Sequence, residues 1–384
     1  MSNEKSLLNA ARLRKAKSTT GRATLLSRRS MLALTFAGSI AAAGVGALPL
    51  SAEQPALSLA AKQRLLSSVI PISSRTLRLT PVTADLPRAV VTAIAADPRG
   101  EVLAVSGDDH AIRIVDMTTM NVLETLEAHR DLVRTLAFSH DGRKLVSAGN
   151  DGQLIVWSRD RNFEVSQQMQ GSPALACVTF SPDGNQMAAV GFDNTVYMIG
   201  RSTTDQPIFK CDCTDLRTVA YRDDGKTLAV AGRSGDIHLF DPRSGRLLFE
   251  KRVHSGRVCD IEFQEDGSQM VSVAEDGTAV VFDTRSLRVM KQIRITTGKL
   301  FAVSILDANH IAVAGSDNIV RIIDLNEEAT IRRLEGHTGS IPTLAYKNGK
   351  LYSGGFDATL RQWTVDQVSS KDARIAEGEH GIDR

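Results

Sequence analysis

Three sets of serine, histidine and aspartate recur along the chain, and serine hydrolases combine these same side chains for catalysis. The sets are His129, Ser147 and Asp151; His254, Ser272 and Asp276; and His337, Ser353 and Asp357. A hydrolase needs one set in a cleft, with an exposed serine and donors arranged around an oxyanion. Here the set returns at a regular interval, and the sequence has no G-x-S-x-G motif. We therefore expect these residues to have a structural role, with no catalytic residue among them.

The four cysteines offer a second kind of chemistry, because thiolates bind metals and form disulfides. Cys211 and Cys213 are one residue apart, but neither a CxxC motif nor a pair of histidines accompanies them. A structural zinc site needs four ligands, so we expect no metal and no cofactor. Cys177 and Cys259 fall in predicted inner strands, where a small apolar thiol is ordinary. Reduced cysteines are the favoured prediction, and a disulfide that involves Cys211 or Cys213 is the alternative.

The elements that would position these residues belong to a repeat of 40 to 42 residues. The glycine of a first turn recurs as Gly100, Gly142, Gly184, Gly225, Gly267 and Gly349, with Asn309 in the sixth copy. The aspartate of a second turn recurs as Asp109, Asp151, Asp193, Asp276, Asp317 and Asp357, with Ser234 in the fourth copy. Asp-Gly pairs favour tight hairpins because glycine accepts the positive φ that two-residue connections require. Each copy therefore has the pattern of a small antiparallel sheet.

One such sheet cannot bury both of its faces, whereas seven arranged radially can. We predict an all-β fold: a seven-bladed β-propeller of four-stranded antiparallel blades over residues 76–366. The last copy ends at Trp363-Thr364 without a fourth strand, and Leu77-Arg78-Leu79 can supply that strand from the N-terminal side. Residues 53–75 have the composition of a linker, and we expect the polar residues 367–384 to be a disordered tail.

Residues 76–366 resemble the WD-repeat (Trp-Asp repeat) β-propeller family. The resemblance rests on Gly336-His337, on the turn aspartates, and on Trp157 and Trp363. It implies that the aspartate of each set orients the histidine, which bonds the serine and, through it, the tryptophan. It also implies that an N-terminal strand closes the last blade and joins the two ends of the chain.

The same resemblance places partner contacts on the face that carries the second turns and the starts of the inner strands. The side chains mapped there are Arg134, Phe192, Arg217, Arg233, Arg257, Lys299, Phe301 and Phe356. Arginine and aromatic side chains are the usual anchors of protein interfaces. We expect a protein or peptide partner and a scaffold without catalysis. Two alternatives stay open: the phenylalanines pack on neighbouring blades, and the arginines are solvated or locally salt-bridged.

A second interpretation of the same fold uses the central channel. Asp260 and Glu262 lie on a predicted inner strand, and some propeller enzymes hold calcium or lactone substrates in that position. Alternation along the strand favours a solvated channel wall for these two carboxylates. The alternative is a lactonase-like or quinoprotein-like propeller that binds a small ligand in the channel.

The first 52 residues have the composition of a targeting segment. The stretch SRRSML, with Arg28 and Arg29, precedes an uncharged run over residues 30–52 and resembles the twin-arginine export signal. That resemblance implies export of a folded protein to the periplasm or cell envelope of a bacterium. The alternatives are a run that is retained as a membrane anchor, a chance Arg-Arg pair in a cytosolic protein, and a thylakoid route.

The charge of the chain is divided between its parts. Residues 1–52 carry eight lysines and arginines against one acid, whereas the whole chain has a net charge of only +2. The remaining residues are therefore mildly acidic and lack the basic surface that phosphate backbones require. We expect no nucleic-acid partner.

Overall fold

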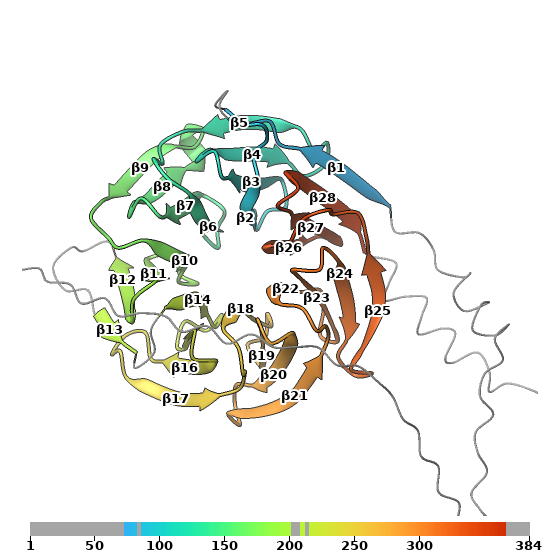
Figure 1. Cartoon of the computed structure of the whole chain (residues 1–384). Helices are drawn as coiled ribbons and strands as arrows, with labels where there is room; N and C mark the ends of the chain where they lie inside the picture. The colour runs from blue at the N-terminus through green and yellow to red at the C-terminus, as the bar shows by residue number, and fades with distance from the viewer. Residues whose placement is uncertain (1–72, 83–85, 201–207, 212–214, 366–384) are drawn as a thin grey trace, which may run out of the picture. The chain divides into compact units, whose positions relative to one another are not determined.

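The computed structural model describes residues 73–82, 86–200, 208–211 and 215–365. These residues form seven four-stranded antiparallel sheets around a central axis, which confirms the predicted seven-bladed β-propeller (Figure 1). The predicted export signal, the 30–52 run, most of the linker, Cys213 and the 367–384 tail lie outside the described residues. Within the described part of the chain, no helix has the length and apolar character needed to cross a membrane.

The strands of each blade follow the chain from the channel outwards, and blade seven takes its outermost strand from the N-terminal side. Blades one to three comprise β2 (Val91–Ala96), β3 (Val102–Gly107), β4 (Ile112–Asp116) and β5 (Val122–Leu126); β6 (Val133–Phe138), β7 (Lys144–Gly149), β8 (Leu154–Ser158) and β9 (Glu164–Met169); and β10 (Leu175–Phe180), β11 (Gln186–Gly191), β12 (Thr195–Gly200) and β13 (Ile208–Lys210). Blades four and five comprise β14 (Leu216–Tyr221), β15 (Leu228–Gly232), β16 (Asp236–Phe240) and β17 (Leu247–Arg252); and β18 (Val258–Phe263), β19 (Gln269–Ala274), β20 (Thr278–Asp283) and β21 (Arg288–Arg294). Blades six and seven comprise β22 (Leu300–Ile305), β23 (His310–Gly315), β24 (Val320–Asp324) and β25 (Ala329–Leu334); and β26 (Thr343–Lys347), β27 (Lys350–Gly354), β28 (Thr359–Thr364) and β1 (Ser74–Arg78).

The ring is closed by β1, which pairs antiparallel with β28 from Ser74↔Trp363 to Arg78↔Thr359. The clasp therefore begins at Ser74, three residues before the predicted Leu77 and inside the stretch expected to be a linker. Leu79 continues the contact, because its backbone N–H donates to the Ala358 carbonyl at 3.0 Å and its side chain is buried.

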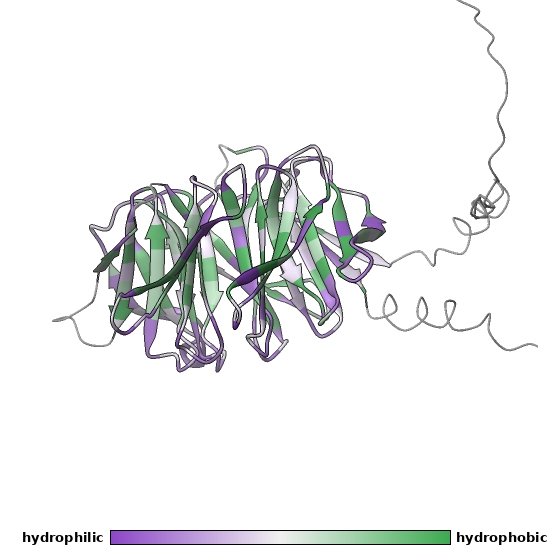
Figure 2. Cartoon of the chain, turned by 90° about the horizontal axis from the view of Figure 1, so that it is seen from below, coloured by the Kyte–Doolittle hydropathy of each residue, from purple (hydrophilic) through white to green (hydrophobic). Residues whose placement is uncertain are grey.

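The hydrophobic core is divided into seven clusters, and each cluster combines side chains from two successive blades. Between blades one and two, for example, Ile112 and Ile114 pack with Leu145 and Trp157. Figure 2 shows that the strands carry the hydrophobic residues and that hydrophilic residues are concentrated in the connecting loops. No blade buries its faces without both neighbours, which is the physical reason for the closed ring.

The innermost strands share an irregularity that positions the candidate site. In blades one to six the register with the second strand shifts around the second residue of the innermost strand, as between Val133 and Thr135. The side chain before each shift is buried, whereas the skipped residue is half-exposed. A bulge re-aims a side chain in this way. The skipped residues are Thr92, Arg134, Ala176, Arg217, Cys259 and Phe301, and Pro342 precedes β26 at the matching place in blade seven.

Candidate partner-binding site at the channel mouth

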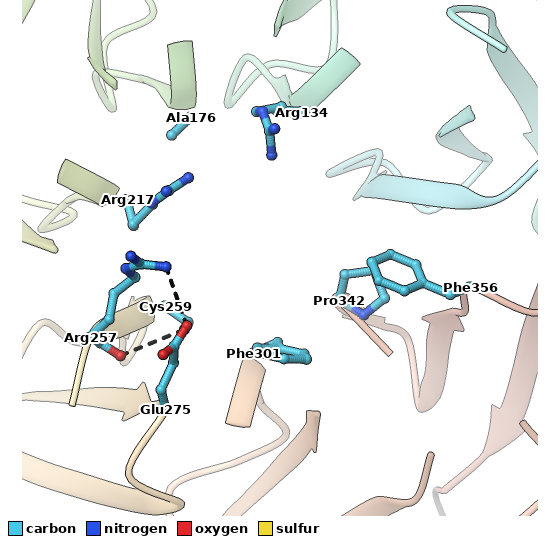
Figure 3. A pocket seen from close by; sticks show the side chains of 9 residues that line it. All are labelled: Arg134, Ala176, Arg217, Arg257, Cys259, Glu275, Phe301, Pro342 and Phe356. Carbon is cyan, nitrogen blue, oxygen red and sulfur yellow. Dashed lines mark hydrogen bonds and ion pairs between the residues drawn. The ribbon is translucent and has the colours of Figure 1, made fainter. Parts of the chain in front are cut away.

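A cavity of about 310 Å³ lies at one mouth of the central channel, and residues from six of the seven blades line it. Its lining comprises Arg134, Ala176, Arg217, Arg257, Cys259, Glu275, Phe301, Pro342 and Phe356. Six of these are the skipped residues of the innermost strands or the matching Pro342, and two belong to second turns. The bulges therefore aim one side chain from each of five blades at a common space, and Pro342 adds one from blade seven, where β26 has no bulge (Figure 3).

Blades four to six supply a chain of ion pairs beside this cavity. Asp215 pairs with Arg217 at 2.7 Å and with Arg257 at 2.9 Å. Glu275 pairs with Arg257 at 3.3 Å and with Lys299 at 3.0 Å. Three cations thus share two carboxylates, which holds the arginine side chains in place and leaves a surplus of positive charge.

Arg134, from blade two, adds a further positive charge to the mouth. Its Nε donates to the Asn150 Oδ1 at 2.5 Å, and within the described residues no carboxylate oxygen lies within 4 Å of its guanidinium. Burial, together with the nearby Arg217 charge, lowers the pKa of Arg134. The charge of Asp131 acts on Arg134 from a distance, so the mouth carries an arginine that forms no ion pair within the described chain.

Phe192 links the arginines of blades two and four. The Arg134 guanidinium carbon lies 5.1 Å from the centre of its ring, and that of Arg217 lies 4.3 Å away. Both distances fit cation–π contacts. The ring remains 39% exposed, so Phe192 contacts cations of the two adjoining blades while keeping an open surface.

The other side of the cavity is apolar. Phe301, Pro342 and Phe356 come from blades six and seven, and Figure 3 shows them across the cavity from Arg134 and Arg217. Phe356 is 46% exposed at the turn between β27 and β28. The mouth thus combines a cationic side with an apolar side.

The structure separates the mapped face residues into two groups. Five of them line the cavity, Phe192 stacks on two of its arginines, and Lys299 pairs with its Glu275. Arg233 does not line the cavity; it is exposed on the turn between β15 and β16. Sequence reasoning missed Ala176, Cys259 and Pro342, because a bulge does not alter the hydrophobic pattern of a strand. The signal that could have found them is their shared position in the repeat.

The serine–histidine–aspartate set of blade two forms a buried chain of hydrogen bonds. His129 Nδ1 lies 2.9 Å from Asp151, and its Nε2 lies 2.7 Å from the Ser147 hydroxyl. The Trp157 Nε1–H donates to the same hydroxyl at 2.9 Å. The ionised Asp151 carboxylate can only accept, so His129 Nδ1–H donates to it, and Nε2 of the neutral ring accepts from the Ser147 hydroxyl. Ser147 has no exposed surface, so a substrate cannot reach it.

Blades seven and five repeat this arrangement, and in both a threonine hydroxyl also contacts the histidine Nδ1, Thr359 at 3.1 Å and Thr278 at 3.0 Å. His337 lies 3.1 Å from Asp357 and 2.8 Å from Ser353, whose hydroxyl accepts from Trp363 at 2.9 Å. His254 lies 2.8 Å from Ser272, and Phe282 takes the place of the tryptophan. Burial lowers the pKa of all three histidines, so each ring is neutral at pH 7.

In three other blades the turn aspartate has a different partner four residues later. Asp109 pairs with Arg113 at 2.5 Å, and both side chains are almost fully buried. Asp317 pairs with Arg321 at 2.8 Å, and Asp193 accepts from the Tyr197 hydroxyl at 2.6 Å. Sequence reasoning missed these pairs, although the constant spacing of four was visible.

Asp260 and Glu262 are half-buried on β18, and Glu262 lines a second cavity of about 590 Å³, as a channel wall would, but both carboxyls also bond the next blade. Asp260 Oδ2 accepts from the Val303 backbone N–H at 3.0 Å, and Glu262 Oε2 accepts from the Ile305 N–H at 2.8 Å. Burial raises the pKa of Asp260 to about 7 and that of Glu262 to about 8. Both carboxyls therefore bind the open edge of the next innermost strand, β22. Within the described residues, no group of three potential metal ligands occurs.

The cysteines of the innermost strands differ from Cys211 in their oxidation state. Cys177 and Cys259 are free, and burial raises the pKa of their thiols to about 11 and about 12. Cys211 is buried and disulfide-bonded. The favoured prediction of reduced cysteines is thus wrong for Cys211, which follows the short strand β13 and lies outside the inner strands that enclose the two free thiols.

These features define a WD-repeat type of β-propeller, and comparison with known proteins agrees. The model of the family described as the IFT122 first beta-propeller matches residues 90–364, and the chain belongs to this family. The Cps50 (Swd1) β-propeller domain of Myceliophteria thermophila is similar in structure, with a TM-score of 0.68 at 17% identity. The match covers 76% of this chain and 100% of that one, and it shows the fold alone.

Curated relatives match shorter stretches. SEC12-like protein 1 of Arabidopsis thaliana is 28% identical over 43% of this chain and 44% of its own length. WD repeat-containing protein SL1-17 of Schistosoma mansoni is 26% identical over 42% of this chain and 54% of its own length. Guanine nucleotide-binding protein subunit beta-5b of Danio rerio is 26% identical over 37% and 38%, respectively. The chain thus spans about half or less of the length of these relatives.

Proposed function

We propose that this protein is an exported, non-catalytic scaffold that binds a protein or peptide partner at the channel mouth. The observation that carries the proposal is the cavity itself, which has a cationic side and an apolar side and is lined by residues of six blades, five of them through bulges. Arginine and exposed aromatic side chains together are typical of binding hot spots. One relative is named as a subunit, which is consistent with a scaffold that works inside a complex.

The binding proposal is tested by placing negative charge on the two exposed aromatic residues of the mouth, one on each side of it. The double variant Phe192→Glu and Phe356→Glu should lose a partner that the wild-type full chain captures from a cell-envelope extract. Both side chains are well exposed, so thermal unfolding should be unchanged. Met290→Glu is the matched control, since Met290 is 52% exposed on the outer strand β21.

The outcome is read from the identified proteins and from thermal unfolding together. A partner that is lost only with the mouth variant supports the proposal. Equal capture by the wild type and the mouth variant, with both proteins folded, would contradict it.

The export part of the proposal rests on Arg28, Arg29 and the uncharged run that follows them. Replacing both arginines with lysine preserves the charge but removes the arginine pair that the resemblance requires. We expect the full-length precursor to accumulate in the cytoplasm of a bacterial host. Unchanged recovery from the periplasm would show that this pair is not an export signal.

A further inference from the structure

We infer that the mouth cavity binds an acidic side chain next to an apolar one, both from an extended peptide segment of the partner. This inference rests on the proposed function and adds the chemistry of the ligand. The cationic side would receive the carboxylate, and the side formed by Phe301, Pro342 and Phe356 would receive the apolar group.

Charge is the first argument for an acidic ligand. Arg217 and Arg257 already share Asp215, whereas Arg134 has only the neutral Asn150 amide as a hydrogen-bond partner within the described chain. In addition, the Nε groups of Arg217 and Arg257 are buried and have no acceptor within the described residues. A guanidinium beside a cavity, without a carboxylate, favours a ligand that brings one.

The amount of charge favours a carboxylate over a phosphoryl group. Glu275 lines the cavity, and Asp215 lies beside it, so two negative charges already reduce the positive potential there. A phosphoryl group carries nearly two negative charges, so these two carboxylates would repel it about twice as strongly as they repel a carboxylate. A single carboxylate matches Arg134, which forms no ion pair within the described chain.

The apolar side supplies the second half of the recognition. Phe356 is 46% exposed, and Phe301 and Pro342 are half-exposed, so a ligand could remove this apolar surface from water. The volume of about 310 Å³ is at the small end of ligand pockets. It fits one or two side chains of an extended segment, and it is too small for a folded element.

The test is a selection experiment with the full chain and pools of synthetic heptapeptides. Wild-type protein should retain peptides in which Asp or Glu adjoins a large apolar residue. For a selected peptide, replacing the acid with its amide should weaken binding about 10- to 100-fold, as expected for loss of one charged hydrogen-bond pair.

Variants of the protein identify the side chain that binds the carboxylate of the peptide. Arg134→Gln should remove the difference between the acid and amide peptides, and Arg134→Glu should shift the selection toward lysine-containing peptides. Arg243→Gln is the control, because Arg243 is an exposed arginine on the turn between β16 and β17 and does not line the cavity. Thermal unfolding shows whether each variant is folded.

Three results would overturn the inference: no peptide is retained, acid and amide peptides bind equally, or a phosphoserine peptide binds more tightly than the acidic one. Failure here is distinguishable from failure of the proposed function. If the mouth variant Phe192→Glu and Phe356→Glu still loses its partner, the scaffold stands and only the ligand chemistry is wrong.

Discussion

The Ser147 hydroxyl is bonded from two sides, whereas among the described residues the equivalent Ser272 hydroxyl bonds His254 alone, and this difference is measurable. Ser147→Ala leaves both His129 Nε2 and the Trp157 N–H buried without a partner. Ser272→Ala leaves only His254 Nε2 unpaired. Each unpaired buried group costs about 1–3 kcal/mol. We expect Ser147→Ala to lower the free energy of unfolding, measured in urea, by the larger amount; equal losses would mean that the tryptophan bond contributes nothing.

Arg113 provides a second prediction at the level of single residues. Its removal in Arg113→Met leaves the Asp109 carboxylate buried without a countercharge. Breaking a buried pair in this way costs about 3–5 kcal/mol. The double variant Asp109→Asn with Arg113→Met removes both charges and should recover part of that loss in urea unfolding. If the single variant is as stable as the wild type, the pair has no role in stability.

Individual residues were predictable where the repeat shows them in several copies. The histidine, serine and aspartate of blades two, five and seven share nearly the same spacing, which marked them as one repeated set, and the WD-repeat resemblance implied how they bond. The Asp109–Arg113 pair and the skipped Cys259 were missed although the repeat offered a signal for both, because a buried arginine and a bulge contradict hydrophobic patterning locally and depend on the surrounding blades.

The clasp is the element whose loss should matter most. Leu79, next to β1, is buried between blades one and seven, and Leu→Ala at such a site costs about 2–5 kcal/mol. Leu123, on the outer strand β5, is 57% exposed, so Leu123→Ala should change stability by only about 0.5 kcal/mol. Thermal and urea unfolding of the two variants compare a leucine of the clasp with one of an ordinary outer strand. Similar losses would show that closure adds nothing.

Strand boundaries were harder to predict than strand existence. Ser74 and Arg75 belong to β1 but are exposed, so no hydrophobic pattern marks them. Their pairing with Trp363 and Gln362 is made by the backbone, and it depends on residues almost three hundred positions away. The sequence therefore indicated a closing strand without indicating its first residues.

The pH dependence of the whole propeller should depend on Asp260 and Glu262. Their pKa values, about 7 and about 8, lie above the ordinary values of 3.8 and 4.5. At low pH both carboxyls are protonated in the folded and the unfolded chain, and they contribute nothing. As pH rises, the unfolded chain loses these protons first, so stability is lost until pH passes about 8.

The double variant Asp260→Asn with Glu262→Gln removes this effect and keeps an oxygen for each backbone N–H. We expect its thermal midpoint, relative to the wild type, to rise between pH 5 and pH 9. The three buried histidines act in the opposite direction, because their lowered pKa values destabilise the fold below pH 6.5. That effect is common to both proteins and cancels in the difference. A difference that is constant with pH would exclude the two carboxyls as its source.

At the scale of the molecule, the fold followed from the repeat, because each interface between blades is built from the same positions of successive copies. The distribution of cationic and apolar residues around the channel mouth could not be derived from the repeat. Arg134, Arg217 and Phe356 come from three blades that meet only when the ring is closed. Sequence mapping placed them on one face, and the sorting into a cationic and an apolar side required the three-dimensional arrangement.

The shared seventh blade has a consequence for synthesis. The ribosome delivers β1 before any other strand of the propeller and β28 after all of them, yet the two are hydrogen-bonded neighbours. A nascent chain can stack its early blades, but it cannot complete the toroid until translation has passed Thr364. Truncated chains that end before β28 would expose the unpaired faces of two blades. Chaperones and proteases could recognise an incomplete propeller by these exposed faces.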